Sequence, residues 1–502
     1  MSAGVELQLN EVSCTKAVDG ASFPRGLQEY PFSIGRPSGW IPNQSFFRFK
    51  ITLAKYAGGN PVAPSYLTDQ VALAENVCST LYTNASFRAG GQDVSSIMSY
   101  IPQAAQAKMR LNKSLGWQKS VGNGCYMVDA DFKERSKTIS SGPFNVGYDS
   151  DSYVAGIGTS ATTAAVAAAT GIVTFATGGP DIQVAGVAPG DIFVLDGKPY
   201  EIGVVTDATH LTLALGAGAV AANIAAQTNW YILKSSANED QGKNSVYVLW
   251  QPPIAIFDHQ GVLGAGDYKF SLMPNADFVK AGIESLGAIT TGVANGNFNL
   301  IVDDVKFYAA TLKTSIPSSV QTLKLIECQI DSKVAQGNTT GTYQFQIPPS
   351  SVALTVWLQA NEAGTDTQYS PTSFRATDKS ERGMTAIQIT YGNVSKPNTK
   401  WSAEFTAGAN YLQQRYFDTY RECDLLNNPG GIETFRDYLN RGMMVHYSFL
   451  RDSQDRSTTC QLSVSVGVLP ANTRVYLCSW YSRVVELTTS EGSVVEVRGL
   501  SV

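Results

Sequence analysis

Apolar and polar residues alternate with a period of two along most of this chain. Tyr268, Phe270 and Leu272, for example, alternate with Lys269 and Ser271. Such alternation places apolar side chains on one face of a strand and polar side chains on the other. Similar runs occur at 5–10, 47–53, 246–250, 298–307, 343–347, 352–358, 387–391, 443–449, 462–468, 475–481 and 484–497. The pattern predicts an all-β protein of half-buried strands, and in the first of them Val5, Leu7 and Leu9 would form the buried face.

Two local features modify these strands. The Pro252–Pro253 pair excludes a central, fully paired strand at 251–257 and fits an edge or a turn. Along 298–307, apolar residues occupy even positions up to Val302 and odd positions from Val305. This change of phase predicts a β-bulge at Asp303–Asp304.

Helical spacing replaces the alternation in each half of the chain. Between 94 and 111, apolar residues follow an amphipathic helix that Pro102 should kink or restart. A second stripe over 412–423 predicts another helix, and Gly430–Gly431 separates it from a short helix at 432–439. Two β-sandwich lobes, each with a helix, are therefore expected.

A segment of different composition interrupts the first lobe. Residues 154–181 are rich in Ala, Gly and Thr and almost free of charge, which is typical of a linker. Asp196–Gly197 then lies between two apolar runs and is the strongest β-hairpin signal in the chain. With further strands at 209–213 and 230–233, this segment is predicted to form a small β-barrel over 171–234, similar to modules found in phage structural and tail proteins.

The domain boundaries follow from these patterns. A length of 502 residues allows roughly three domains. The strands on either side of 155–236 form one sandwich if that segment is removed. The prediction is a discontinuous first lobe at 1–154 and 237–312, an inserted β-rich domain at 155–236, and a second lobe at 313–502, with the two lobes joined near 311–319.

Charge and cysteine content narrow the possible partners and compartment. The chain has 37 Lys and Arg residues against 42 Asp and Glu residues, and neither end carries a basic tail, so strong non-specific attraction to nucleic acid is not expected. The seven cysteines are odd in number and widely spread, which indicates reduced thiols in a protein that folds inside a cell. No secretory signal or membrane-spanning segment is evident, and solubility before assembly is expected.

Candidate catalytic chemistry is sparse. The histidines, His210, His259 and His446, are expected in surface or packing roles. No zinc-protease, phosphate-loop, nucleophile-elbow or dinucleotide motif occurs in a suitable context. The acidic pairs Asp129/Asp131, Asp149/Asp151 and Asp303/Asp304 could be glycosidase carboxylates or calcium ligands, but spacing alone does not join partners from different strands. The tryptophans could stack on sugars, and core packing is favoured for Trp40, Trp250, Trp357, Trp401 and Trp480. No catalytic, cofactor-binding or metal-binding residue is assigned, and no cofactor is expected.

The order and spacing of these segments resemble the double jelly-roll major capsid proteins of the adenovirus and tailless membrane-containing phage lineage. The points of resemblance are 252–257, the turn at 264–266, the strand ending at 273–275 and the strand 298–307 in the first lobe, and 342–358, the loop 369–374 and the block 416–450 in the second. The resemblance implies an all-β fold of two jelly-roll lobes with short flanking helices, and the insert adds a small β-barrel to the first lobe.

The resemblance also implies a function. It predicts a structural protein of the virion, not an enzyme, whose homotrimers form pseudo-hexagonal capsomers that tile an icosahedral shell. Neighbouring capsomers, penton and minor capsid proteins would be its partners, with an internal viral membrane left open, and the insert would stand outward as a turret that contacts a host receptor. Two alternatives remain: a phage receptor-binding or tail-associated protein, and a carbohydrate-active jelly-roll enzyme.

Overall fold

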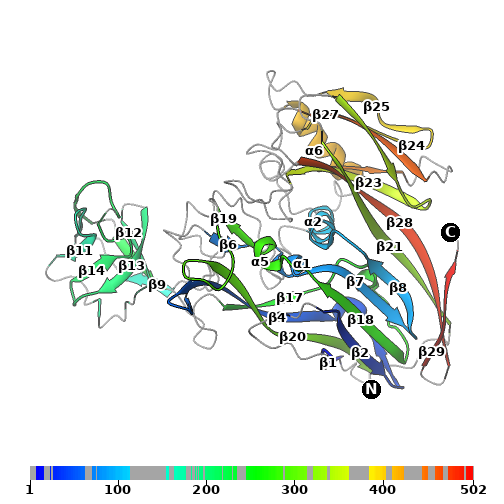
Figure 1. Ribbon diagram of the computed structural model, residues 1–502, viewed down its shortest axis with the longest axis horizontal. Coiled ribbons are helices and arrows are strands. Elements are labelled where there is room, and N and C mark those ends of the chain that lie inside the picture. Colours follow the sequence, from blue (N-terminus) through cyan, green and yellow to red (C-terminus); the bar gives the residue numbers. More distant parts are fainter. Residues whose placement is uncertain are drawn as a thin grey trace, which may run out of the picture.

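A computed structural model gives the fold. It describes residues 7–15, 23, 26–62, 71–74, 76–113, 154–157, 163–176, 182–183, 187, 189, 191–195, 198–217, 219–228, 230–234, 245–285, 289–313, 320–335, 340–360, 384–402, 410–422, 444–449, 458–466, 473–490 and 493–500. These residues form two large β-sandwich lobes and a smaller β-rich unit to one side of them (Figure 1).

The first lobe is built on two antiparallel sheets, each with four main strands. One has the order β1-β20-β4-β17 and the other β2-β18-β7-β8. The first sheet contains β1 (Leu7–Ser13), β20 (Phe298–Lys313), β4 (Phe46–Ala57) and β17 (Ser245–Trp250). The second contains β2 (Gln28–Ile34), β18 (Gly266–Pro274), β7 (Tyr82–Ala89) and β8 (Gln92–Ile97). Short strands extend this lobe: β3 (Ser38–Trp40) on β20, β5 (Asn60–Val62) on β4, and the pair β6 (Val71–Leu73) and β19 (Ile283–Ser285).

The second lobe repeats this arrangement with unrelated residues. Its sheets have the orders β21-β28-β23-β26 and β22-β27-β24-β25. The first contains β21 (Val320–Val334), β28 (Thr473–Ser490), β23 (Ser351–Ala360) and β26 (Met444–Ser448), and β29 (Ser493–Leu500) pairs with β28. The second contains β22 (Thr340–Gln346), β27 (Thr459–Val466), β24 (Met384–Tyr391) and β25 (Val394–Ser402).

The two lobes share one topology. If the eight main strands of each lobe are lettered B to I in chain order, both lobes have one sheet in the order B-I-D-G and a second in the order C-H-E-F. This connectivity is that of a jelly roll, built from two Greek keys. The predicted all-β fold with two jelly-roll lobes is confirmed, and the two sheets are called the BIDG and CHEF sheets below.

Helices lie in the connections between these strands. The two longer ones, α2 (Ile101–Asn112) and α6 (Asn410–Glu422), both follow an F strand and precede a G strand. Shorter turns are α1 (Val77–Thr80), α5 (Phe278–Ala281), η1 (Pro42–Gln44) and η5 (Ala255–Asp258). The η5 turn follows Pro252–Pro253, which agrees with the predicted turn.

The helix expected over 94–111 begins later than predicted. Residues 92–97 belong to β8, and Pro102 lies in the first turn of α2 instead of in its interior. Proline is tolerated there because the first-turn N–H groups have no partner within the helix. The short helix expected at 432–439 lies outside the described residues.

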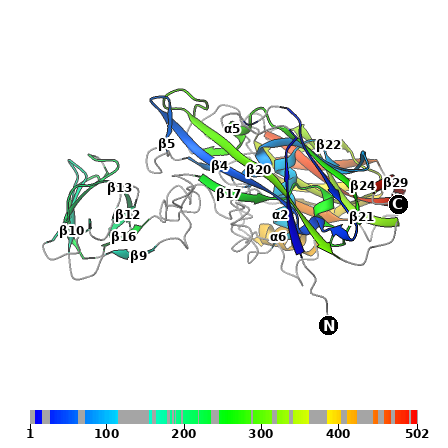
Figure 2. The ribbon, with the colours of Figure 1, turned by 90° about the horizontal axis from the view of Figure 1, so that it is seen from below.

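The inserted unit is an eight-stranded curled sheet between α2 and the G strand of the first lobe. Its order is β15-β10-β11-β14-β13-β12-β16-β9, and the unit lies to one side of the two lobes in both views (Figures 1 and 2). The strands are β9 (Val154–Ile157), β10 (Ala164–Ala167), β11 (Ile172–Phe175), β12 (Ile192–Leu195), β13 (Lys198–Val205), β14 (His210–Leu213), β15 (Ile224–Gln227) and β16 (Trp230–Lys234). Leu195 opposes Lys198 across an antiparallel pair, which confirms the hairpin predicted at Asp196–Gly197.

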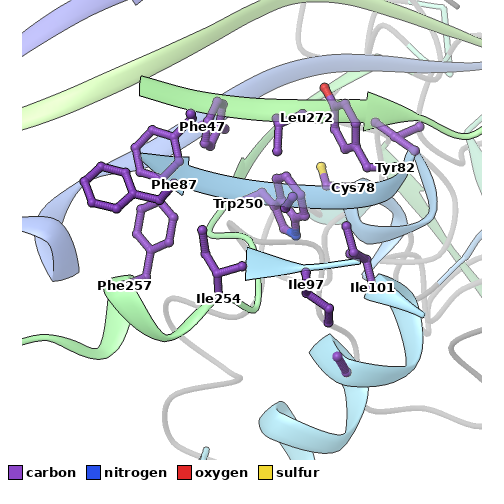
Figure 3. Packing of buried hydrophobic residues seen from close by; sticks show 14 of the residues in the cluster. Phe47, Cys78, Tyr82, Phe87, Ile97, Ile101, Trp250, Ile254, Phe257 and Leu272 are labelled. Carbon is purple, nitrogen blue, oxygen red and sulfur yellow. The ribbon is translucent and has the colours of Figure 1, made fainter. Parts of the chain in front are cut away.

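Three hydrophobic clusters fill the molecule. The insert has its own, around Phe175, Phe193 and Trp230. A second lies between the two sheets of the second lobe. The largest fills the first lobe and continues without a break onto the BIDG sheet of the second (Figure 3 shows its first-lobe part). The two lobes are therefore joined by a shared core, not merely by a linker.

Most burial predictions hold, with one exception. Trp40, Trp250 and Trp357 are fully buried and Trp480 nearly so, as expected for core residues, while nothing is described of the Trp401 side chain. Leu7 and Leu9, however, are 51% and 52% exposed. Both belong to β1, which pairs only with β20 and turns these two side chains away from the core. Periodicity identified the strand correctly but not which of its faces is buried.

Candidate assembly surfaces

The BIDG sheet of each lobe has one face on its own core and one face turned outward. In the second lobe, residues on this outward side include Cys328, Ile330, Ser332, Thr355, Trp357, Met444, His446, Tyr476, Cys478 and Trp480, and we call them the second-lobe outer face. In the first lobe, the corresponding residues include Leu7, Leu9, Glu11, Phe46, Arg48, Lys50, Tyr247, Asp304, Lys306 and Tyr308, and we call them the first-lobe outer face.

The second-lobe outer face is buried against the first lobe. The Tyr100 ring, just before α2, meets Tyr476 edge to face at 5.6 Å, and its hydroxyl lies 3.1 Å from Ser332 Oγ. Elsewhere β21 contacts β8 and η5. Trp357 stacks on Tyr476 at 5.5 Å within the same face. The second lobe therefore packs against the side of the first lobe formed by its F strand, α2 and η5.

A buried hydrogen-bonded chain crosses this second-lobe outer face. Trp480 Nε1 donates to Thr355 Oγ1 at 2.8 Å, and Thr355 Oγ1 lies 2.8 Å from His446 Nδ1. Burial lowers the pKa of His446 to about 4, so the imidazole is neutral at pH 7. His446 thus has a packing role, one of the two that the sequence left open.

Glu327 is a second buried ionisable group at the contact between the lobes. It lies on β21 and is only 2% exposed. Burial raises its pKa to about 7, while a hydrogen bond with Ser95 of β8 and the charges of Arg483 and Lys108 act in the opposite direction. Its Oε1 atom has no hydrogen-bond partner among the described residues. This carboxyl group is therefore poised to change charge near neutral pH.

The first-lobe outer face carries charged and aromatic side chains instead. Arg48 Nη2 lies 2.6 Å from Asp304 Oδ2, and Lys306 Nζ lies 2.6 Å from Glu11 Oε1 and 3.5 Å from Asp304 Oδ1. The hydrogen bond with Lys306 is the main reason that the pKa of Glu11 lies below its usual value. The Tyr308 hydroxyl also donates to Glu11. These pairs hold the polar groups of the face in a single ordered network.

Aromatic rings frame this network. The Arg48 guanidinium lies 5.2 Å from the ring centroids of both Tyr247 and Tyr308, within the range of a cation–π interaction. Phe46 stacks on Tyr308 at 5.4 Å. Tyr247 is nevertheless 44% exposed. The first-lobe outer face is thus ordered but partly open to solvent.

The predicted bulge builds part of this surface. The β20–β4 register shifts between Asp303 and Lys306, and Asp304 has a positive φ of 50°. Left-handed backbone is most accessible to Gly, Asn and Asp among the natural residues. The bulge directs the Asp304 carboxylate toward Arg48 and Lys306, so this acidic residue serves an ion-pair network.

The other candidate residues do not converge on one site. His210 lies on the insert, where Asp207 Oδ1 is 2.9 Å from its Nδ1, and His259 follows η5 on the first lobe. Asp129/Asp131 and Asp149/Asp151 lie outside the described residues. Within the described parts of the chain, no group of three or more His, Cys, Asp or Glu residues could hold a metal ion, and no helix is long and apolar enough to cross a membrane.

The sequence reasoning did not single out the first-lobe outer face. A signal was present, because Phe46 and Tyr308 occupy the polar phase of their strands, beside Arg48 and Lys306. Large aromatic residues among charged ones on a sheet face are typical of an interaction surface. Their proximity depends on the pairing of strands more than 250 residues apart in sequence, which periodicity does not predict.

Long connections collect at one end of the lobes. The E and F strands are joined by tight turns, with Gly90 and Gly91 both at positive φ between β7 and β8, as a type I′ hairpin requires. The D–E and F–G connections therefore lie at the opposite end. The insert occupies the F–G connection of the first lobe, and α6 occupies that of the second.

Comparison with known proteins places this fold. No protein family model matches the sequence, and no curated protein matches it. Among solved structures, the chain is similar to one from the cryo-EM structure of the Sputnik virophage, with a TM-score of 0.52 and 11% identity over 99% of this chain and 88% of that one. A crystal structure of PBCV-1 VP54 fitted into a Sputnik reconstruction gives a TM-score of 0.46 at 8% identity, covering 99% of this chain and 97% of that chain. The mavirus major capsid protein gives 0.43 at 9% identity, with 98% and 90% covered.

These likenesses bear on the fold. The Sputnik chain matches across both lobes at very low sequence identity, which agrees with the strand orders described above. The protein is a double jelly roll, the fold that the order of its sequence segments suggested.

Proposed function

We propose that this chain is a major capsid protein whose homotrimers form pseudo-hexagonal capsomers of an icosahedral shell. The observation that carries the proposal is the repeat of one BIDG and CHEF topology in two lobes fixed together by a shared core. Three such chains place six similar lobes in a ring, an outline that can contact six neighbours. The likeness to a chain of the Sputnik virophage particle supports this function. Penton and minor capsid proteins would then be further partners.

We further propose that residues 155–236 form a turret on the outer surface of the shell and bind a host receptor. The insert has a hydrophobic core separate from those of the lobes. It also lies in a connection at the end of the first lobe where long connections gather, and such loops tolerate insertions and carry binding functions.

Light scattering and electron microscopy of the purified protein test the capsid function. We expect a mass of about three times the 53.8 kDa of one chain, and shells or hexagonal arrays under assembly conditions. A protein that remains monomeric under those conditions would contradict the proposal. Fibres or a tail-like complex would favour the tail-associated alternative.

A deletion tests the turret. We expect that replacing 155–236 with a short Gly-Ser linker preserves folded trimers, because changing the length of a surface loop alters its closure entropy only slightly. Attachment to host cells should fall. Loss of folding would show that the segment belongs to the core of the lobe, and unchanged attachment would remove the receptor role alone.

A further inference from the structure

The contact between the two lobes within one chain provides a template for contacts between chains. The second-lobe outer face packs against the F strand β8, the helix α2 and η5 of the first lobe. This contact is head to tail, because the BIDG sheet of one lobe meets a different side of the other. Head-to-tail contacts form a closed ring when their rotation closes.

The contact within the chain uses the outer face of the second lobe and one side of the first lobe, so the equivalent surface on the other lobe is unused in each case. Because both lobes have the same topology, the chain retains a first-lobe outer face and a second-lobe side made of the F strand β25 and the helix α6. We call the latter the α6 side. We propose that the first-lobe outer face binds the α6 side of a second copy of this chain. This inference rests on the proposed function and names the surfaces that join the capsomer.

The first-lobe outer face has the composition of a protein interface. Tyr and Arg are enriched at interface centres, and Arg48 lies between Tyr247 and Tyr308 here. Leu7 and Leu9 are half exposed on the adjacent edge strand β1. The ion pairs and ring contacts already order these side chains, so little conformational entropy remains to be lost on binding.

The α6 side presents an exposed aromatic side chain of its own, Phe417, beside Tyr416, which packs on the second-lobe core. Phe417 is 48% exposed, and its ring lies 5.7 Å from that of Tyr416. Tyr416 in turn lies 4.6 Å from Tyr420. The helix is fixed to the lobe, because Glu422 accepts a hydrogen bond from Ser448 N of β26 and pairs with Lys396 of β25. In the intrachain contact, Tyr100 beside α2 provides the corresponding aromatic contact.

The charged groups of both surfaces are already paired within the chain. Arg48 and Lys306 pair with Asp304 and Glu11 on the first-lobe outer face, and Asp418 pairs with Arg421 on α6. Aromatic groups on both surfaces can cover one another, and Arg48 lies among those of the first-lobe outer face with its charge already paired to Asp304.

Single substitutions on each surface test the pairing. We expect Leu9→Glu and Phe417→Glu each to weaken trimers at least 10-fold, measured as the concentration for half dissociation in analytical ultracentrifugation. Far-UV circular dichroism should not change, because both side chains are about half exposed. The matched control is Val204→Glu. Val204 is 55% exposed on the insert, and this substitution should change the concentration for half dissociation less than 2-fold. If Leu9→Glu alters the circular dichroism, Leu9→Ser replaces it.

Mixing the two variants tests the direction of the contact. A Leu9→Glu chain keeps an intact α6 side, and a Phe417→Glu chain keeps an intact first-lobe outer face. A head-to-tail contact therefore predicts 1:1 heterodimers at concentrations where each variant alone is monomeric. Two results would overturn the inference and leave the capsid proposal intact. In the first, the wild-type chain and both variants are all trimeric. In the second, the mixture of the two variants stays monomeric. A monomeric wild-type chain would instead overturn the capsid proposal itself.

Discussion

The outer faces of the two BIDG sheets occupy the same place in the same topology, yet their chemistry differs. The second-lobe outer face is built around Trp357, Tyr476 and Cys478 and is buried by the first lobe. The first-lobe outer face is built around Arg48, Lys306 and Tyr308 and remains partly exposed. The first of these contacts forms as the chain folds and resembles a protein core, whereas an exposed face must remain compatible with water.

This difference shows how one fold can serve two kinds of contact. A permanently covered face can be apolar because it is never exposed after folding. A face that awaits a partner must avoid indiscriminate association, and charged groups in fixed pairs provide both solubility and selectivity. Substitutions on the two faces should therefore have separable effects on folding and on assembly.

The largest effect is expected from truncating the buried face. Trp357→Ala should lower the free energy of unfolding by about 3–5 kcal/mol, because it leaves a cavity where a fully buried ring stacks on Tyr476. Tyr247→Ala on the exposed face should lower it by about 1 kcal/mol or less. Urea titration followed by circular dichroism gives both values. Equal losses from the two substitutions would remove the distinction between the faces.

Acid should weaken the buried face through His446. Its pKa is about 4 in the folded protein against 6.5 in the unfolded chain, so the unfolded state binds more protons between these values. The free energy of unfolding should have its full value above pH 6.5 and should fall by up to about 3 kcal/mol as the pH drops to 4. His446→Gln should remove this part of the pH dependence, and His210→Gln on the insert is the control. An unchanged slope in His446→Gln would contradict the assignment.

Glu327 should act in the opposite direction. The pKa of Glu327 in the folded protein, about 7, exceeds the ordinary value of 4.5. Its contribution to the free energy of unfolding is therefore fully present below pH 4.5 and is lost as the pH rises through 7. Glu327→Gln should raise stability at pH 8 by about 2 kcal/mol, less than the pKa difference alone gives because Lys108 and Arg483 lose a favourable neighbour. Thermal melts at pH 4 and pH 8 measure the effect. A variant that is less stable than wild type at pH 8 would show that the carboxylate is needed.

Reducing agents are expected to leave the thermal stability of the protein unchanged. Cys328 and Cys478 on the buried face are free thiols, as are Cys14 and Cys460. Burial raises the pKa of the Cys478 thiol well above its usual value, which disfavours the reactive thiolate. The melting temperature should be the same with and without dithiothreitol. A marked decrease on reduction would reveal a disulfide that contributes to stability.

The sequence by itself determined the local features of this protein. Alternation located most strands, the phase change at Val302 and Val305 located the bulge, and Asp196–Gly197 located the hairpin of the insert. Each of these signals depends on residues close together in the chain, where the period of a strand or the conformational preference of a turn acts directly. Pro102 was expected to kink or restart a helix over 94–111, but residues 92–97 form a strand and the helix begins only at Ile101.

The tertiary structure decided which faces meet. Leu9 alternates as a core residue does, yet its strand lies at a sheet edge and the side chain is exposed. His446 was identified as a surface or packing residue, and only the contact between the lobes selects packing. Glu11, Arg48 and Lys306 form one network because β1, β4 and β20 pair across most of the first lobe. Burial and proximity of this kind depend on long-range strand pairing and on the packing of one lobe against another, and the period of a single strand carries no information about either.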